Sequence, residues 1–217
     1  MKLVASELYN VAWFKLADFV ARGEKERALS VHKLLMHSVT DEAIPYQLEG
    51  DILLAFDDEG ALDRYHIAAN LYKKVGKVKQ AASVYEHVCV FKEDEKILEA
   101  LFDVYLVQKD YDGILNTFSR LAKICLQQSN VACITNLFHR HVIESDVSLR
   151  AQLSVRFVRA LMLYDKNNSQ ISVYLHQAVD LLNECGKEEE LFQFLSLIEE
   201  LDKELYAKAQ QYVEKSI

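Results

Sequence analysis

Two cysteines and two histidines in one part of the chain come nearest to a metal-binding pattern. Cys125 and Cys133 precede His139 and His141, and thiolate and imidazole groups are ligands that zinc prefers. Residues two apart on a helix point to different faces, so both histidines cannot converge on one ion. The chain has four cysteines and no C-x-x-C pair, so we expect reduced, mostly buried thiols. The sequence therefore predicts no metal site and no cofactor.

Cysteine and histidine could also serve nucleophilic catalysis, but the sequence lacks the framework that such a site needs. It shows no strand-to-helix elbow, no glycine-rich loop and no oxyanion-type turn. We therefore expect no enzyme activity.

Two groups of cations could contact an acidic partner. The first group is Lys73, Lys74, Lys77 and Lys79, and the second is Arg150, Arg156 and Arg159 on one predicted helix. A solvated helix end is the favoured explanation for the lysines, because cations favour helix C-termini. For the arginines, of which the last two are adjacent on one face, partner contact and plain surface both stay open.

The composition predicts an all-α chain. Among 217 residues, 51% are apolar and only one is proline and six are glycine, so hairpin turns and sheet corners would lack their usual residues. The net charge of −8 argues against nucleic-acid binding, which needs clustered Lys and Arg. No signal-peptide pattern and no apolar run of about 18 residues is present, so we expect a cytoplasmic protein without direct membrane insertion.

A repeat of 33 residues organises the middle of the chain. Seven apolar or small positions between residues 62 and 121 recur at this one offset, as in Tyr65 with Leu98, Tyr72 with Tyr105, and Tyr85 with Phe118. A period in the low thirties is typical of stacked helical hairpins that bury their faces against neighbouring hairpins. The aromatic residues of this part of the chain are expected to pack between helices, and they are Tyr65, Tyr72, Tyr85, Phe91, Phe102, Tyr105 and Phe118.

We expect a single domain over residues 1–217, with the best repeats at 62–127 and atypical capping helices at both ends. The pattern becomes less regular after Asn130. Glycines at positions 23, 76 and 186 are expected to end helices, and a further bend is expected at residues 109–110. Periodicity and cap residues predict about twelve helices at residues 6–22, 24–38, 41–56, 61–75, 77–91, 93–108, 111–127, 131–145, 147–164, 171–185, 187–200 and 202–216.

The repeat resembles the tetratricopeptide repeat, in which helical hairpins stack into a superhelix. The first repeat matches the family pattern at Tyr65, Ala69, Tyr72, Ala81 and Tyr85. In the second repeat the turn at residues 109–114 is similar to the family's inter-helix turn, whereas Phe102 and Ile114 replace a small residue and an alanine. The first helix of the repeat could also pair with the preceding helix at 41–56, which has no clear repeat partner, so the pairing phase stays open.

This resemblance implies an α-solenoid that binds another protein or a peptide in a groove lined by the first helices. In this register the groove residues would be Asp63, His66, Asn70, Lys73, Lys96, Glu99 and Asp103. Family members that hold a terminal carboxylate use Lys and Asn at set places, and of these only Asn70 is present, with His66 in place of Lys. A carboxylate clamp is therefore not expected.

We interpret the chain as a scaffold or adaptor that holds a peptide or helix of a partner protein. The alternative is a regulatory solenoid that responds to a small ligand or peptide. RNA-binding helical repeats have a similar period, but they need a basic groove and matching polar pairs in every repeat. Matching places here hold unlike residues, such as Asn70 and Asp103, so we expect no nucleic-acid partner.

Overall fold

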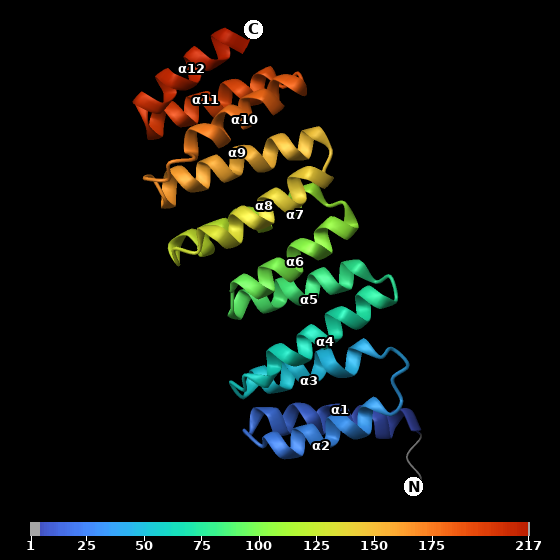
Figure 1. Ribbon diagram of the computed structural model, residues 1–217. Coiled ribbons are helices and arrows are strands. Elements are labelled where there is room, and N and C mark those ends of the chain that lie inside the picture. Colours follow the sequence, from blue (N-terminus) through green and yellow to red (C-terminus); the bar gives the residue numbers. More distant parts are fainter. Residues whose placement is uncertain (1–4, 217) are drawn as a thin grey trace. The chain divides into compact units, whose positions relative to one another are not determined.

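The computed structural model describes the backbone of residues 5–216 and the side chains of residues 11–140 and 145–214 (Figure 1). Residues 5–216 form twelve α-helices and no strand. The helices are α1 (Ala5–Ala21), α2 (Lys25–Met36), α3 (Ala43–Ala55), α4 (Gly60–Lys74), α5 (Val78–Phe91), α6 (Glu95–Gln108), α7 (Tyr111–Gln127), α8 (Val131–Glu144), α9 (Val147–Tyr164), α10 (Ile171–Glu184), α11 (Glu188–Leu201) and α12 (Lys203–Ser216).

The prediction of an all-α solenoid of antiparallel hairpins is confirmed, because each helix packs mainly on its neighbours in the sequence. The chain forms two compact units, Met1–Glu93 and Asp94–Ile217. The two halves of the sequence repeat belong to different units, since α4 and α5 lie in the first and α6 and α7 in the second. The single domain over residues 1–217 stays a prediction.

Left-handed residues end several helices and reverse the chain. Gly23 has φ 76° and Gly76 has φ 76°, a conformation that glycine adopts at no steric cost. At the second turn the amide of Lys77 donates to the carbonyl of Tyr72 at 2.9 Å, which closes the helix end in a Schellman arrangement. Lys109 has φ 56° at the corresponding bend between α6 and α7. These are the bends that the sequence predicted.

In the first unit, α4 packs against helices on both sides. Its partners are α3, with which it forms the most extensive contact, and α5. The sequence left open whether α4 pairs with α3 or with α5, and in the structure it packs against both. Gly50 of α3 makes the first contact possible, because a Cβ atom there would lie 3.0 Å from the Tyr65 ring. The Tyr65 hydroxyl donates to Asp51 Oδ1 at 2.7 Å. On the side of α5, Ala69 and Ala81 are fully buried and allow close approach.

A series of aromatic rings in mutual contact lies in the core of the second unit. Phe118 of α7 lies 6.3 Å from Phe138 of α8, and Phe138 stacks on Phe157 of α9 at 4.6 Å between ring centroids. Phe157 meets Tyr174 of α10 at 4.8 Å. Such aromatic pairs stabilise a core beyond their buried area. In the first unit Phe91 departs from the expected packing role, because it is 57% exposed at the end of α5.

Several polar contacts join residues about one repeat apart, in addition to contacts of shorter sequence separation such as that of His32 with Pro45. These contacts span 32 to 37 residues along the chain and occur in both units. The pairs are Lys25–Asp58, Asp41–Lys77, Glu95–Asn130, Glu99–Cys133, Tyr111–Asp146, Ser119–Arg156, His139–Tyr174 and Asp180–Tyr212. The period therefore continues after Asn130, where the sequence pattern loses its regularity.

Within residues 5–216, none of the helices combines the length and the apolar character that crossing a bilayer requires.

Candidate functional site

The residues expected to line a groove on α4 fall into two groups. Asp63 and His66 lie beside a hollow of about 660 Å³ between α3 and α4, whereas Asn70 and Lys73 are not among its lining residues. The lining consists of Glu49, Leu53, Asp58, Gly60, Asp63, Arg64, His66 and Ile67. The structure thus brings two of the four predicted α4 residues together at one surface feature.

Most charges around this hollow are already paired. Arg64 Nε lies 3.2 Å from Glu49 Oε2, and Lys25 pairs with Asp58, which lowers the pKa of that carboxyl through the lysine's hydrogen bond. His66 Nδ1 lies 3.2 Å from the Tyr85 hydroxyl. Few unmatched groups remain here to recognise a ligand.

The groove residues predicted on α6 lie in the second unit, and they differ in exposure. Lys96 and Asp103 are exposed. Glu99 is half-buried, and its Oε1 accepts from Cys133 Sγ of α8 at 3.7 Å. The neighbouring hairpin therefore occupies one of the expected groove residues.

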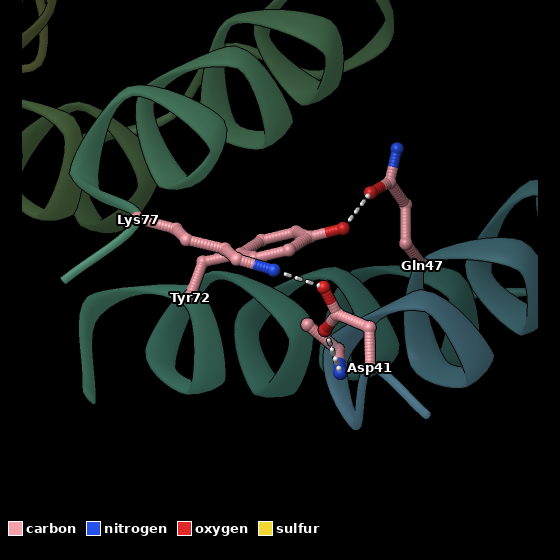
Figure 2. A network of polar contacts seen from close by, with 5 residues as sticks. Asp41, Gln47, Tyr72 and Lys77 are labelled. Atoms are coloured by element: carbon pink, nitrogen blue, oxygen red, sulfur yellow. Dashed lines mark hydrogen bonds and ion pairs between the residues drawn. The ribbon is translucent and has the colours of Figure 1, made fainter. Parts of the chain in front are cut away.

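The lysine group at the end of α4 is partly neutralised within the fold. Lys73 and Lys74 lie in the last turn of α4, where a positive charge is stabilised by the helix dipole. Lys77 Nζ donates to Asp41 Oδ2 at 2.5 Å. Figure 2 shows this contact beside the hydrogen bond from the Tyr72 hydroxyl to Gln47 Oε1. This hydrogen bond from Lys77 is the main cause that lowers the pKa of Asp41.

Two arginines of α9 line two adjacent hollows in the second unit. Arg156 and Arg159 face a hollow of about 470 Å³ shared with α11 and another of about 250 Å³ shared with α7. The first is lined by Gln152, Val155, Arg156, Arg159, Glu190, Gln193, Phe194 and Leu197, and the second by Ser119, Arg156, Arg159, Ala160, Leu163 and Tyr164. We call the surface that these residues form the arginine face.

The protein offsets the charge of the arginine face only in part, through the influence of the Asp112 carboxylate on Arg156. Among the residues with described side chains, neither Arg156 nor Arg159 forms an ion pair. Arg156 is half-buried and donates from Nη1 to Ser119 Oγ at 3.4 Å, and Glu190 on the rim pairs with Lys187 instead. Burial, with the like charge of Arg159, lowers the pKa of Arg156. A guanidinium held in this way favours an anionic group brought from outside.

A group of thiols and carboxylates lies between α6, α7 and α8. Ser129, with φ 58°, ends α7 in a tight turn, which brings Cys133 at the start of α8 back towards Cys125 at the end of α7. One ligand atom from each of Glu95, Cys125 and Cys133 lies within 4.8 Å of the other two. Burial, followed by the influence of Glu95, raises the pKa of Cys133.

The histidines that the sequence placed near these cysteines are not part of this group. His139 is exposed, and its Nε2 lies 3.3 Å from the Tyr174 hydroxyl of α10. The side chain of His141 lies outside the described residues. Glu95 and Glu99 were not connected with the cysteines from the sequence, because each glutamate lies 30 or more residues before its cysteine. The repeat period was the signal that could have linked them.

No protein-family model matches the chain, and no curated protein matches it. The resemblance to tetratricopeptide repeats therefore stays a prediction from the sequence pattern.

Proposed function

We propose that the protein is a binding scaffold that holds an acidic segment of another protein against the arginine face. The observation that carries this proposal is that two adjacent hollows share Arg156 and Arg159, which form no ion pair among the described side chains. Planar guanidinium groups bind carboxylates with two parallel hydrogen bonds. The sequence left open whether these arginines contact a partner or are plain surface residues, and we take them as partner contacts.

The surroundings of the arginines suit a peptide with both acidic and apolar side chains. Phe194 is only 3% exposed and, with Leu197 and Val155, gives the larger hollow an apolar wall. Gln152 and Gln193 add amide groups that can bind a peptide backbone. Apolar anchoring beside a few well-placed polar groups is the usual composition of a recognition site.

The α4 hollow is a second place where the sequence predicts partner contact. Its pairs Arg64–Glu49 and Lys25–Asp58 leave fewer groups for a ligand than the arginine face does. The arginine face is therefore our choice, and the groove residues on α4 and α6 stay a prediction. The ligand-responsive regulator also stays an alternative, because either hollow could respond to a small molecule.

The proposal is tested with a random peptide library displayed on phage and selected on the 217-residue chain. We expect enrichment of peptides rich in Asp and Glu. Binding of an enriched peptide, followed by fluorescence polarisation, should weaken by at least about 100-fold in Arg156→Gln/Arg159→Gln, because each lost charged hydrogen bond costs about 1.5–3 kcal/mol and the variant removes at least two. It should also weaken as salt is added.

Two variants serve as controls. Arg140→Gln removes an exposed arginine of α8 that lines neither hollow, and it should bind like the wild type. Asp63→Asn/His66→Ala alters the α4 hollow. Loss of binding in this variant alone, or enriched peptides without acidic residues, would show that the arginine face is not the site.

A further inference from the structure

Side chains from three helices of the second unit form a cluster of sulfur and oxygen donors. Cys125 Sγ lies 3.9 Å from Glu95 Oε2, and Cys133 Sγ lies 3.7 Å from Glu99 Oε1. Glu95 and Glu99 are one turn apart on α6, so both face the same side of that helix. Cys125 is fully buried and the other three residues are half-buried.

The cluster is supported by a further polar residue. Asn130 Nδ2 donates to Glu95 Oε2 at 3.1 Å and its Oδ1 accepts from the Cys133 amide at 3.4 Å. Asn130 thereby connects one carboxylate to the backbone that carries one thiol. Outer hydrogen bonds of this kind orient the ligands of metal sites.

We propose that Glu95, Cys125 and Cys133 bind a Zn²⁺ ion, with Glu99 as the candidate for the fourth ligand. Three donor atoms already lie within 4.8 Å of one another, a spread that small side-chain rotations reduce to zinc–ligand distances of about 2.0–2.3 Å. Two sulfur donors disfavour Mg²⁺ and Ca²⁺, which bind through oxygen. A tetrahedral d¹⁰ ion accepts both donor types.

Binding is an exchange of protons for the metal ion. The two thiols donate hydrogen bonds to the carboxylates in the metal-free protein. Zn²⁺ replaces the two S–H protons with two Zn–S bonds, and the protons pass to the buffer. The two thiolates and the two carboxylates then surround a divalent cation, and no oxidant or reductant takes part.

The ion would add metal–ligand bonds between helices that are otherwise joined by side-chain packing and hydrogen bonds. Glu95 lies in the first turn of α6, Cys125 in the last turn of α7 and Cys133 in the first turn of α8. A ligand that binds only the folded state raises its stability by mass action. Zinc would therefore stabilise the turn between α7 and α8 and its contact with α6. This inference stands apart from the arginine face, which uses other residues.

The test uses the reduced, chelator-treated 217-residue chain titrated with Co²⁺ and then with Zn²⁺. We expect one ion per chain, a sulfur-to-cobalt charge-transfer band that Zn²⁺ removes, release of two protons and a higher Tm with Zn²⁺. Cys133→Ser and Glu95→Gln should lose the tight site, and Asn130→Ala should bind about 10- to 100-fold more weakly. Cys185→Ser, which changes a half-buried cysteine at the end of α10, should bind like the wild type.

Circular dichroism of each variant without metal establishes that it is folded. Absence of the charge-transfer band in the folded wild type would overturn the proposal. Equal binding by Cys133→Ser, Glu95→Gln and Cys185→Ser would also overturn it, because the ion would then lie elsewhere. A Cys125–Cys133 disulfide that forms in air, with no metal bound by the reduced chain, would show that the pair is a redox site instead.

Discussion

Gly113 lies so close to Tyr105 that a Cβ atom on Gly113 would stand 2.5 Å from Cδ1 and 2.7 Å from Cγ of the tyrosine ring. Glycine in a helix normally costs about 0.5–1 kcal/mol relative to alanine. Here the close approach of α6 and α7 requires it. We expect Gly113→Ala to lower the free energy of unfolding by about 1–3 kcal/mol, as overpacking does, measured by urea denaturation.

The control for this prediction changes the ring. In a Tyr105→Leu background the added methyl group meets a smaller side chain, so Gly113→Ala should cost less there than in the wild type. An increase in stability on Gly113→Ala alone would contradict the contact.

Ala69 sits at a buried small-residue position of α4, with no exposed surface. Ala69→Leu should overpack the contact of α4 with its neighbours and cost about 1–3 kcal/mol. Ala21→Leu, at an exposed position of α1, is the matched control and should leave the Tm nearly unchanged. Equal melting temperatures of the wild type and Ala69→Leu would refute the proposed repeat register.

His32 should make the first unit sensitive to mild acid. It is 5% exposed and its Nε2–H donates to the carbonyl of Pro45 at 2.9 Å. Burial lowers the pKa of His32 below its ordinary 6.5, against the opposing influence of the Pro45 carbonyl and Glu49. The unfolded chain therefore binds more protons below about pH 6.5, and stability falls as the pH drops towards the folded-state pKa.

The measurement is the free energy of unfolding between pH 7.5 and pH 5 for the wild type and His32→Gln. The glutamine keeps a donor for Pro45 but does not titrate. We expect the decline with falling pH to be shallower in the variant, and parallel curves would show that His32 does not cause it.

Asp146 joins the start of α9 to α7. Its Oδ1 accepts from the Leu149 amide at 2.9 Å, as an N-cap, and its Oδ2 accepts from the Tyr111 hydroxyl at 2.5 Å. Loss of such a cap costs about 0.5–2 kcal/mol, which we expect for Asp146→Ala at pH 7. The Tyr111 and Leu149 hydrogen bonds lower the pKa of Asp146 below its ordinary 3.8.

This lowered pKa gives the prediction a pH window. The stabilisation is present above about pH 3.8 and is lost as the pH falls through the folded-state pKa. The cost of Asp146→Ala should thus shrink in strong acid, as measured by thermal denaturation. Tyr111→Phe should lose only the stabilisation from the Tyr111–Asp146 hydrogen bond and keep the Leu149 cap. If the stability lost in Asp146→Ala is the same at every pH, the charge of Asp146 has no role.

Local signals in the sequence were enough to predict the helices. Periodic apolar residues and the glycines at positions 23, 76 and 186 placed every helix boundary within two residues of its position in the structure. These features act over one helical turn, so no knowledge of the tertiary fold was needed. The partner of α3 was harder to predict. Glycine has a low helix propensity, and only the structure shows that Gly50 leaves room for the Tyr65 ring of α4.

The candidate sites were less predictable than the helices. Arg156 and Arg159 were identified as adjacent on one helix, but their lack of an ion pair among the described side chains depends on what α7 and α11 place around them. The meeting of Glu95 with Cys125 also depends on the packing of three helices. Side chains that meet across hairpins leave no pattern in a window of one or two turns.

The pairs that lie 32 to 37 residues apart also have a consequence for how the protein folds. A hairpin can reach its polar partners by closing a loop of about one repeat, which costs less chain entropy than closing the ends of a whole domain, by about 0.6 kcal/mol for each halving of the loop. Chains with contacts of short sequence separation fold quickly. Folding can therefore begin at any hairpin, and amide hydrogen exchange should rise in steps from hairpin to hairpin within each unit instead of in one transition.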